Sequence, residues 1–211
     1  MRLVLASTSP RRRELLALLN IPFEIRSPRY EESVAPHRPV DDLVVDFSRA
    51  KADSVAAEEP HSLVLASDTL IDCDHDALGK PRDLAEARLM LRQLAGRAHL
   101  VKTAVTAECR DRRFGRTQIA TARVWMKAFD RNAHERYLAT QDSLGKAGAY
   151  SIQGPGVELI ERLEGDFTTV VGFPLRVVAH LLTEAGMTVP ADVDELYVRK
   201  PYGNWSRFPA D

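Results

Sequence analysis

The chain alternates short apolar runs with stretches of helical periodicity, and no other feature restricts its fold as much. Residues 3–6 and 63–66 are fully apolar and have the length of buried strands. Other stretches carry an apolar residue every three or four positions, which is the spacing of a helix with one buried face. Strands interleaved with helices pack in layers around one sheet. We therefore predict an α/β fold with a mixed, twisted sheet and flanking helices.

Capping residues mark where the predicted helices begin. Ser9 and Pro10 fit the N-cap and first position of a helix, and Asp83 and Asp130 fit N-caps further along the chain. The expected helices cover residues 10–20, 41–57 and 131–139, a stretch from residue 84 that Gly96 ends, and a last helix from Pro174. The expected strands cover residues 3–6, 63–66, 99–108, 117–128 and 157–163. The third and fourth strands form a hairpin that we assign to part of a second lobe.

Two segments lack regular periodicity. Residues 28–40 are rich in proline and charge, and they are expected to form a long surface loop. Periodicity is lost again after residue 190. A chain of 211 residues is long enough to bury a sizeable core without disulfides. We therefore predict a single bilobed domain over residues 1–189 and a C-terminal tail, laid on the surface, over residues 190–211.

The charge balance bears on possible partners. Lys and Arg number 29 against 30 Asp and Glu, a net charge of −1, so the chain has no overall field that would attract nucleic acid. No apolar run approaches the ~20 residues of a membrane span, and the short apolar run at the N-terminus leads us to expect no secretory signal. We expect no stable nucleic-acid binding, no membrane association and a reduced, cytoplasmic location, with Cys73 and Cys109 as core residues.

Basic residues gather at the start of the first predicted helix. Arg11, Arg12 and Arg13 follow Pro10, where unpaired backbone N–H groups and the positive end of the helix dipole already favour an anion. This arrangement predicts a phosphate-binding turn. The alternative is a basic turn that is only solvated.

Polar residues follow the second apolar run. Asp68 comes directly after the predicted strand at 63–66, and α/β proteins bind ligands beyond the carboxyl ends of such strands. Lys80 lies between Gly79 and Pro81, where it is either a solvated loop charge or a cation held for phosphate. Asp68 has its own alternative, which is a turn or N-cap carboxylate. Carboxylates, lysines and arginines beside glycine loops are the side chains that phosphoryl chemistry on a nucleotide requires.

Residues 146–156 form a glycine-rich segment in which Lys146 and Gln153 can recognise charge and amide-like groups. Its spacing fits neither the P-loop nor the dinucleotide-binding fingerprint. Glu31 and Glu32, in the early loop, could supply a carboxylate for a cation, although such pairs are often only solvated.

These segments resemble the Maf family of nucleoside triphosphate pyrophosphatases. The resemblance extends from Leu3 to about Leu182 in the family's order, and the blocks that carry it are Ala6–Arg12, Ser67–Thr69, Gly79–Pro81, Gly96–Thr103, Lys146–Gly154, Glu161–Asp166 and Val171–Leu175. It implies two lobes around a deep cleft, an architecture similar to that of inosine triphosphate pyrophosphatases, and usually a homodimer. It also implies hydrolysis between the α and β phosphates with Mg²⁺ or Mn²⁺.

The resemblance assigns roles by position. It implies catalytic roles for Asp68, Lys80 and Glu32, with Asp68 and Glu32 also holding the cation. It implies substrate-binding positions at Ser7, Arg11, Arg12, Lys51, Thr69, Lys146 and Gln153. Two alternatives stay open, since the early loop has no fixed spacing that separates Glu31 from Glu32, and Asp68 can act as a base or as a metal ligand.

Three positions indicate the branch of the family. Arg11, Thr69 and Gln153 resemble the branch that acts on dTTP and UTP, whereas a branch acting on 7-methyl-GTP carries tryptophan and glutamate at the first and last of them. The expected activity is therefore pyrophosphate release from dTTP and UTP, or from modified pyrimidine nucleotides. The alternatives are the 7-methyl-GTP activity and a regulator of cell division that senses a nucleotide without hydrolysing it.

Overall fold

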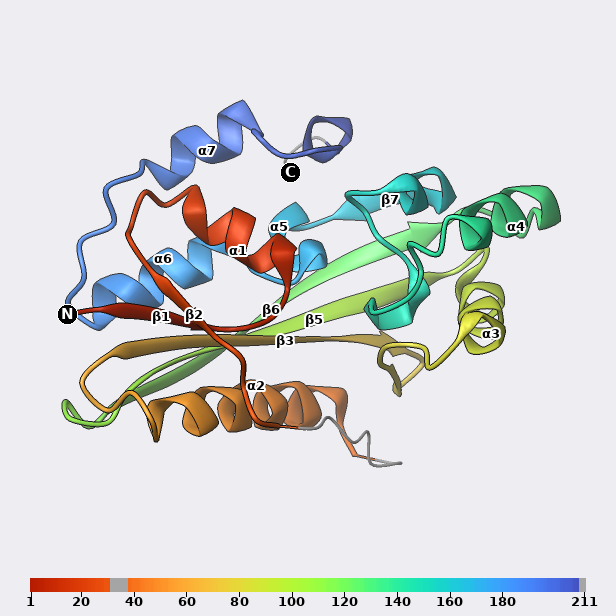
Figure 1. The fold of residues 1–211 in the computed structure, drawn as a ribbon. Coiled ribbons are helices and arrows are strands. Elements are labelled where there is room, and N and C mark those ends of the chain that lie inside the picture. The colour runs from red at the N-terminus through yellow and green to blue at the C-terminus, as the bar shows by residue number, and fades with distance from the viewer. Residues whose placement is uncertain (31–37, 209–211) are drawn as a thin grey trace.

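The computed structural model describes residues 1–30 and 38–208, and within them seven strands form one mixed sheet (Figure 1). The strands are β1 (Leu3–Ala6), β2 (Glu24–Arg26), β3 (Leu63–Cys73), β4 (Asp76–Leu78), β5 (Ala98–Cys109), β6 (Phe114–Met126) and β7 (Ile160–Glu164). Their order is β2-β1-β3-β5-β6-β7, with β4 also paired to β3. β1 is parallel to β2 and β3, and the other pairs are antiparallel. The predicted α/β class with a mixed sheet is confirmed, whereas the division into two lobes around a cleft stays a prediction.

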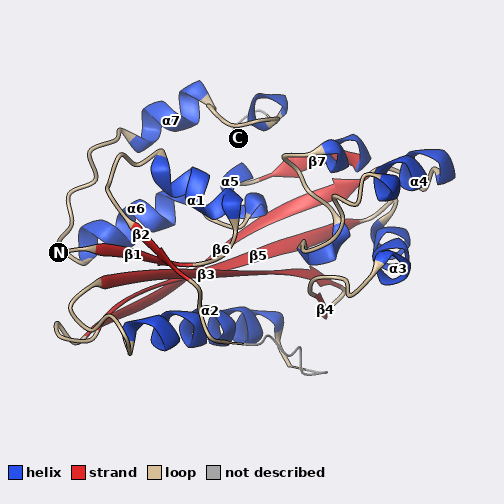
Figure 2. Cartoon of the chain, viewed as in Figure 1, coloured by secondary structure: helices blue, strands red, loops and turns tan. Residues whose placement is uncertain are grey.

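Helices cover both faces of this sheet (Figure 2). They are α1 (Pro10–Ala17), α2 (Val40–Ala56), α3 (Leu84–Leu94), α4 (Arg131–Ala139), α5 (Phe167–Val171), α6 (Leu175–Glu184) and α7 (Val193–Arg199). Short 3-10 turns occupy Ala147–Ala149, Pro155–Leu159 and Trp205–Arg207. α2 lies against one face, over β3 and β5, while α1 and α6 lie on the other.

The two apolar runs form the strands β1 and the first part of β3, and both faces of these strands are buried. Successive side chains of a strand point to opposite faces. Leu3 and Leu63 accordingly belong to the main core, while Val4 and Val64 pack with Val55 of α2 in a second cluster. A strand covered on both sides loses the apolar–polar alternation of a half-exposed strand. Cys73 and Cys109 are both buried in the main core.

The predicted caps have mixed outcomes. Asp83 accepts a hydrogen bond from the backbone N–H of Glu86 at 2.8 Å, and Asp130 accepts one from that of Ala133 at 3.0 Å, so both N-caps are confirmed. Ser9 occupies the N-cap position of α1, but its side chain makes no capping hydrogen bond. α1 ends at Ala17, earlier than predicted.

β3 is much longer than predicted. The apolar run ends at Ala66, but the strand continues to Cys73 because β5 pairs with it from Val64 to Asp72. Asp68 therefore lies within a strand, and the prediction that it follows a strand end is wrong. Tertiary pairing of the backbone has overridden the polar side chains of this stretch.

Three further differences lie near the C-terminus. β7 begins at Ile160 because residues 155–159 form a 3-10 turn. The short helix α5 is capped by Asp166, which accepts hydrogen bonds from the N–H groups of Thr168 and Thr169. The helix from Pro174 is not the last one, since α7 follows it.

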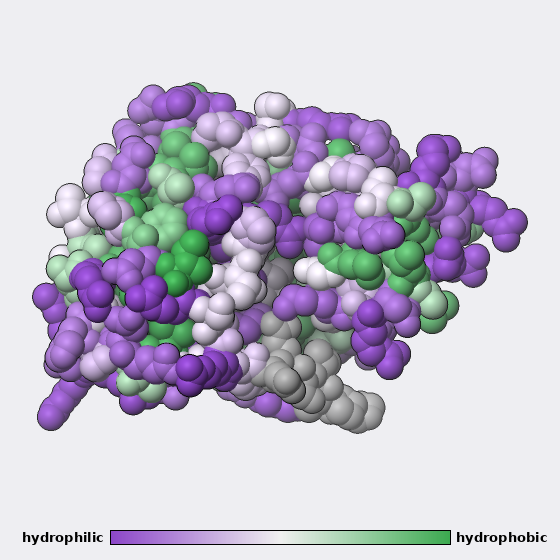
Figure 3. Space-filling view, viewed as in Figure 1, coloured by the Kyte–Doolittle hydropathy of each residue, from purple (hydrophilic) through white to green (hydrophobic). Residues whose placement is uncertain are grey.

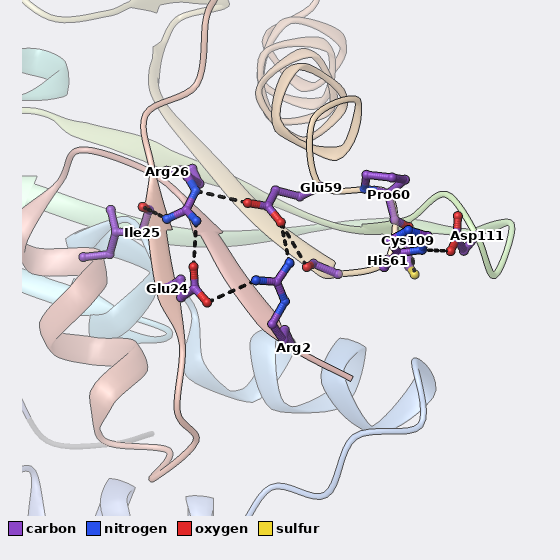
Figure 4. Close-up of polar contacts among 10 residues, drawn as sticks. Arg2, Glu24, Ile25, Arg26, Glu59, Pro60, His61, Cys109 and Asp111 are labelled. Atoms are coloured by element: carbon purple, nitrogen blue, oxygen red, sulfur yellow. Dashed lines mark hydrogen bonds and ion pairs between the residues drawn. The ribbon is translucent and has the colours of Figure 1, made fainter.

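Ion pairs join the parallel edge of the sheet to the loop after α2 (Figure 4). Arg2 contacts Glu59 at 2.8 Å and Glu24 at 3.4 Å, and Arg26 contacts the same two carboxylates at 3.1 and 2.7 Å. Exposed pairs stabilise a fold little when isolated. A closed network of four side chains, however, ties β1 and β2 to the segment that leads into β3.

The surface shown in Figure 3 is largely hydrophilic, with apolar groups in separate areas. Within residues 1–30 and 38–208, no helix combines the length and the apolar character that crossing a bilayer requires.

A buried polar pair links β5 to the turn at residues 147–149. His99 Nε2 lies 2.8 Å from the hydroxyl of Tyr150, and both side chains are buried. Burial lowers the pKa of His99 from 6.5 to about 4. Between these two pH values the unfolded chain binds more protons than the native protein, so the free energy of unfolding falls as the pH falls.

We predict that His99→Gln weakens this pH dependence. Between pH 7 and 4.5 the wild type should lose about 2 kcal/mol more stability than the variant, since each unit of pKa shift is about 1.4 kcal/mol. Urea denaturation at the two pH values measures the difference. Parallel losses in the two proteins would mean that His99 does not titrate as its burial implies.

Candidate functional site

A pocket of about 1020 Å³ lies beside the end of β1 and the middle of β3. Nine of the ten residues proposed from the sequence line it: Ser7, Arg11, Arg12, Lys51, Asp68, Thr69, Lys80, Lys146 and Gln153. The tenth, Glu32, and its alternative Glu31 lie outside the described residues. The structure thus brings together side chains from five separate segments of the chain.

The pairing of the sheet explains why a pocket opens here. β1 pairs with β3 only from Leu63 to Leu65, and β4 pairs with it only from Ile71 to Cys73. Along the described strands, this leaves the β1 edge of β3 open around Asp68. Because β1 has ended, Asp68 on the α2 face of the sheet and Thr69 on the opposite face can line the same pocket.

Asp68 forms a buried ion pair with Lys51 of α2. Lys51 Nζ donates to Asp68 Oδ1, and the side chains are only 7% and 3% exposed. Buried charges are tolerated where partners replace the lost water. The pair places a carboxylate and an ammonium group in contact at the wall of the pocket, where each replaces part of the water that the other has lost.

Arg12 joins three segments of the chain. Its guanidinium donates to the carbonyl oxygens of Ser67 at 2.6 Å and Gly172 at 3.0 Å, and lies 3.5 Å from Thr69 Oγ1. Gly172 has φ +101°, and a Cβ there would lie 2.9 Å from Thr69 Oγ1, so only glycine fits this approach. Arg12 therefore holds the start of α1 against β3 and the end of α5.

The glycine-rich segment forms another part of the pocket wall. Lys146 pairs with Asp142 at 2.9 Å, and a Cβ on Gly154 would lie 2.6 Å from Asp142 Oδ2. Both polar atoms of the Gln153 amide are buried and have no hydrogen-bond partner within the described residues. An amide left in this way is stabilised by a ligand that hydrogen-bonds to it.

The remaining predicted residues also occupy defined places. Ser7 is buried directly after β1, and its hydroxyl oxygen accepts from the N–H of Ser9 at 3.1 Å. Arg11 also lines the pocket, and burial lowers the pKa of its guanidinium. Lys80 lines the pocket from the loop after β4.

Sequence reasoning missed several pocket residues. Glu14, Asp142 and Tyr202 line the pocket but fall outside the residues assigned roles by the resemblance. Asp142 could have been suggested by its four-residue separation from Lys146. Tyr202 lies in the predicted tail, where no pattern pointed to a site.

The charges of the described lining favour an anionic ligand. Five cationic side chains face three carboxylates there, in a chain whose net charge is −1. Among residues 1–30 and 38–208, which include the described lining of the pocket, no three His, Cys, Asp or Glu side chains lie close enough together to hold a metal ion. A single carboxylate such as Asp68 suits Mg²⁺, which is commonly held by one or two carboxylates together with substrate phosphates and water.

Comparison with known proteins identifies the family. The Maf-like protein family matches residues 2–185. The chain belongs to the Maf family. This Maf protein is 41% identical to a dTTP/UTP pyrophosphatase of Bacillus velezensis, over 87% of the chain and 96% of the relative. Proteins of the same name from Moorella thermoacetica and Anaeromyxobacter dehalogenans are 45% and 43% identical, over 89% and 90% of this chain and 97% and 96% of their own.

The contacts of Arg12 generate a stability prediction for this Maf protein. Arg12→Ala removes charge-assisted hydrogen bonds to two backbone carbonyls and should lower the free energy of unfolding by about 2 kcal/mol or more. Arg13→Ala, at an exposed neighbouring position, should change it by less than about 0.5 kcal/mol. Chemical denaturation measures both. Equal effects of the two substitutions would contradict the structural role of Arg12.

Proposed function

We propose that this protein hydrolyses dTTP and UTP to the nucleoside monophosphate and pyrophosphate. The observation that carries the proposal is the assembly of nine motif residues around one cationic pocket. The names of the relatives, which are dTTP/UTP pyrophosphatases, support the same activity. In the reaction, water attacks the α-phosphorus, and the bond between that atom and the bridging oxygen to the β-phosphorus breaks.

The cationic side chains form the phosphate end of the pocket. Arg12 lies in the first turn of α1, where backbone N–H groups also attract anions. Lys80 and Lys51 face the pocket from other segments. We assign to these three side chains the stabilisation of charge on the α-phosphoryl group and on the departing pyrophosphate.

We assign the activation of the attacking water to Asp68, which lines the pocket. It accepts the proton of the attacking water or holds a divalent cation, and both roles require its charge. Asp68 and Glu32 would hold Mg²⁺ or Mn²⁺ together with triphosphate oxygens, and the cation would neutralise phosphate charge. Lys51 orients the Asp68 carboxylate from the α2 side through its hydrogen bond to Oδ1.

Gln153 is assigned to the base. The uracil or thymine edge offers one N–H donor beside carbonyl acceptors, which match an amide that both donates and accepts. A guanine edge presents two adjacent donors, which a carboxylate would satisfy and an amide would not. Methylation at N7 makes guanine cationic, so Arg11 would repel it where a tryptophan face would attract it. A homodimer and a cytoplasmic location stay predictions.

We predict that Asp68→Asn abolishes pyrophosphate release while the protein stays folded. The substitution is nearly isosteric but removes the charge, so the rate should fall ~100-fold or more. Asp72→Asn is the matched control, since Asp72 lies on the same face of β3, outside the pocket, and pairs with Lys102 at 3.2 Å. Circular dichroism checks the fold of both variants. Normal turnover by Asp68→Asn would contradict the assignment.

The same assay separates an enzyme from a nucleotide sensor. A sensor would bind UTP without releasing pyrophosphate, whatever metal ion is supplied. Metal-dependent release by the wild type, lost in Asp68→Asn and kept in Asp72→Asn, excludes the sensor.

We predict that dTTP and UTP are preferred to 7-methyl-GTP by roughly 5- to 150-fold in kcat/KM, the equivalent of about 1–3 kcal/mol for a buried hydrogen-bond mismatch. Gln153→Glu should reduce this preference. Steady-state kinetics with the three nucleotides measures it. A higher kcat/KM for 7-methyl-GTP than for both pyrimidine nucleotides would refute the base assignment and leave pyrophosphate release itself standing.

A further inference from the structure

The residues that follow the family match have a defined place in the fold. The match ends at residue 185, and the C-terminal segment, residues 191–208, lies beside α1 (Figure 1). Trp205 is buried and stacks on Phe167 of α5, with ring centroids 5.5 Å apart and planes at 9°. The hydroxyl of Tyr197 lies 2.9 Å from Thr168 Oγ1. The segment is therefore anchored to α5.

Asn204 connects this segment to the Gln153 loop. Its side-chain nitrogen lies 2.8 Å from the carbonyl oxygen of Gln153, 3.1 Å from that of Ile152 and 3.3 Å from that of Gly154. Asn204 has φ +65°, a left-handed conformation that asparagine adopts more readily than most residues. The two N–H groups of one side chain are thus shared among three consecutive carbonyl groups.

Tyr202 connects the same segment to the opposite side of the pocket. Its hydroxyl donates to Glu14 of α1, and Tyr202 itself lines the pocket together with Pro201 and Gly203. α1 also carries Arg11 and Arg12. The segment therefore contacts both the helix that presents the arginines and the loop that presents Gln153.

The Gln153 side chain depends on its backbone for orientation. Its amide atoms have no hydrogen-bond partner within the described residues, so none of these side chains orients the amide through a hydrogen bond. The main hydrogen bond on its own carbonyl comes from Asn204. A shift of the backbone would consequently move the amide directly.

We propose that the C-terminal segment is a positioning element for the base end of the pocket, in which Asn204 fixes the loop that carries Gln153 and Tyr202 fixes the distance of that wall from α1. This inference rests on the proposed function, because it takes the pocket to bind a pyrimidine nucleotide. It assigns a task to residues beyond the matched part of the family.

The test separates the base end from the phosphate end. Asn204→Gly keeps the left-handed backbone accessible but removes the three contacts. It should weaken UMP binding and raise the KM for UTP by about 10-fold, with kcat changed by less than about 3-fold. Binding of tripolyphosphate, which has no base, should stay unchanged. Calorimetry measures the two dissociation constants without any need for turnover.

Two further variants complete the test. Asp194→Asn is the control within the C-terminal segment. It removes an exposed ion pair of 2.6 Å with Arg176 of α6 and should leave both dissociation constants unchanged. Tyr202→Phe removes only the contact with Glu14 and should weaken UMP binding alone, so it also decides the matter if Asn204→Gly does not fold. Unchanged UMP binding, or equal weakening of UMP and tripolyphosphate, would overturn the inference. Absence of dTTP and UTP hydrolysis by the wild type would instead contradict the proposed function.

Discussion

The buried ion pair between Lys51 and Asp68 constrains everything around it. A carboxylate inside a sheet is stable only if charge and hydrogen bonds reach it, and α2 provides the lysine because its apolar face packs on β3 and β5. The same arrangement requires β1 to stop early, since a longer β1 would close the edge beside Asp68. The packing of α2, the length of β1 and the position of the pocket therefore depend on one another.

Electrostatics explain how a nearly neutral chain can have a pocket with an excess of positive charge. Cations from α1, α2 and two loops meet in one concave place, where their fields add, while most other charges pair on the surface. Arg12 shows that such a cation can serve the fold as well, since it bonds to the backbone of β3 and of the turn after α5. The start of α1 is therefore held in place before any ligand arrives.

Much of the fold could be predicted from local signals, and the exceptions have physical causes. Asp83 and Asp130 mark helix starts because their carboxylates satisfy backbone N–H groups nearby in the sequence. The length of β3 could not be predicted, because its polar half is a strand only through pairing with β5. The motif residues do surround one pocket, but their roles stay predictions, and Glu32 lies outside the described residues. Tyr202 gave no signal, since its partner Glu14 is remote in sequence.

The separation of Glu14 and Tyr202 in the sequence also determines the order in which the parts of the pocket are synthesised. Glu14 and Tyr202 are 188 residues apart, so their contact closes a loop that contains almost the whole chain. While the polypeptide emerges from the ribosome, the sheet and the arginine-bearing helix are already available, but the wall built by Tyr202 and Asn204 is not. The side of the pocket that carries Arg11 and Arg12 is therefore synthesised well before the side that carries Tyr202 and Asn204.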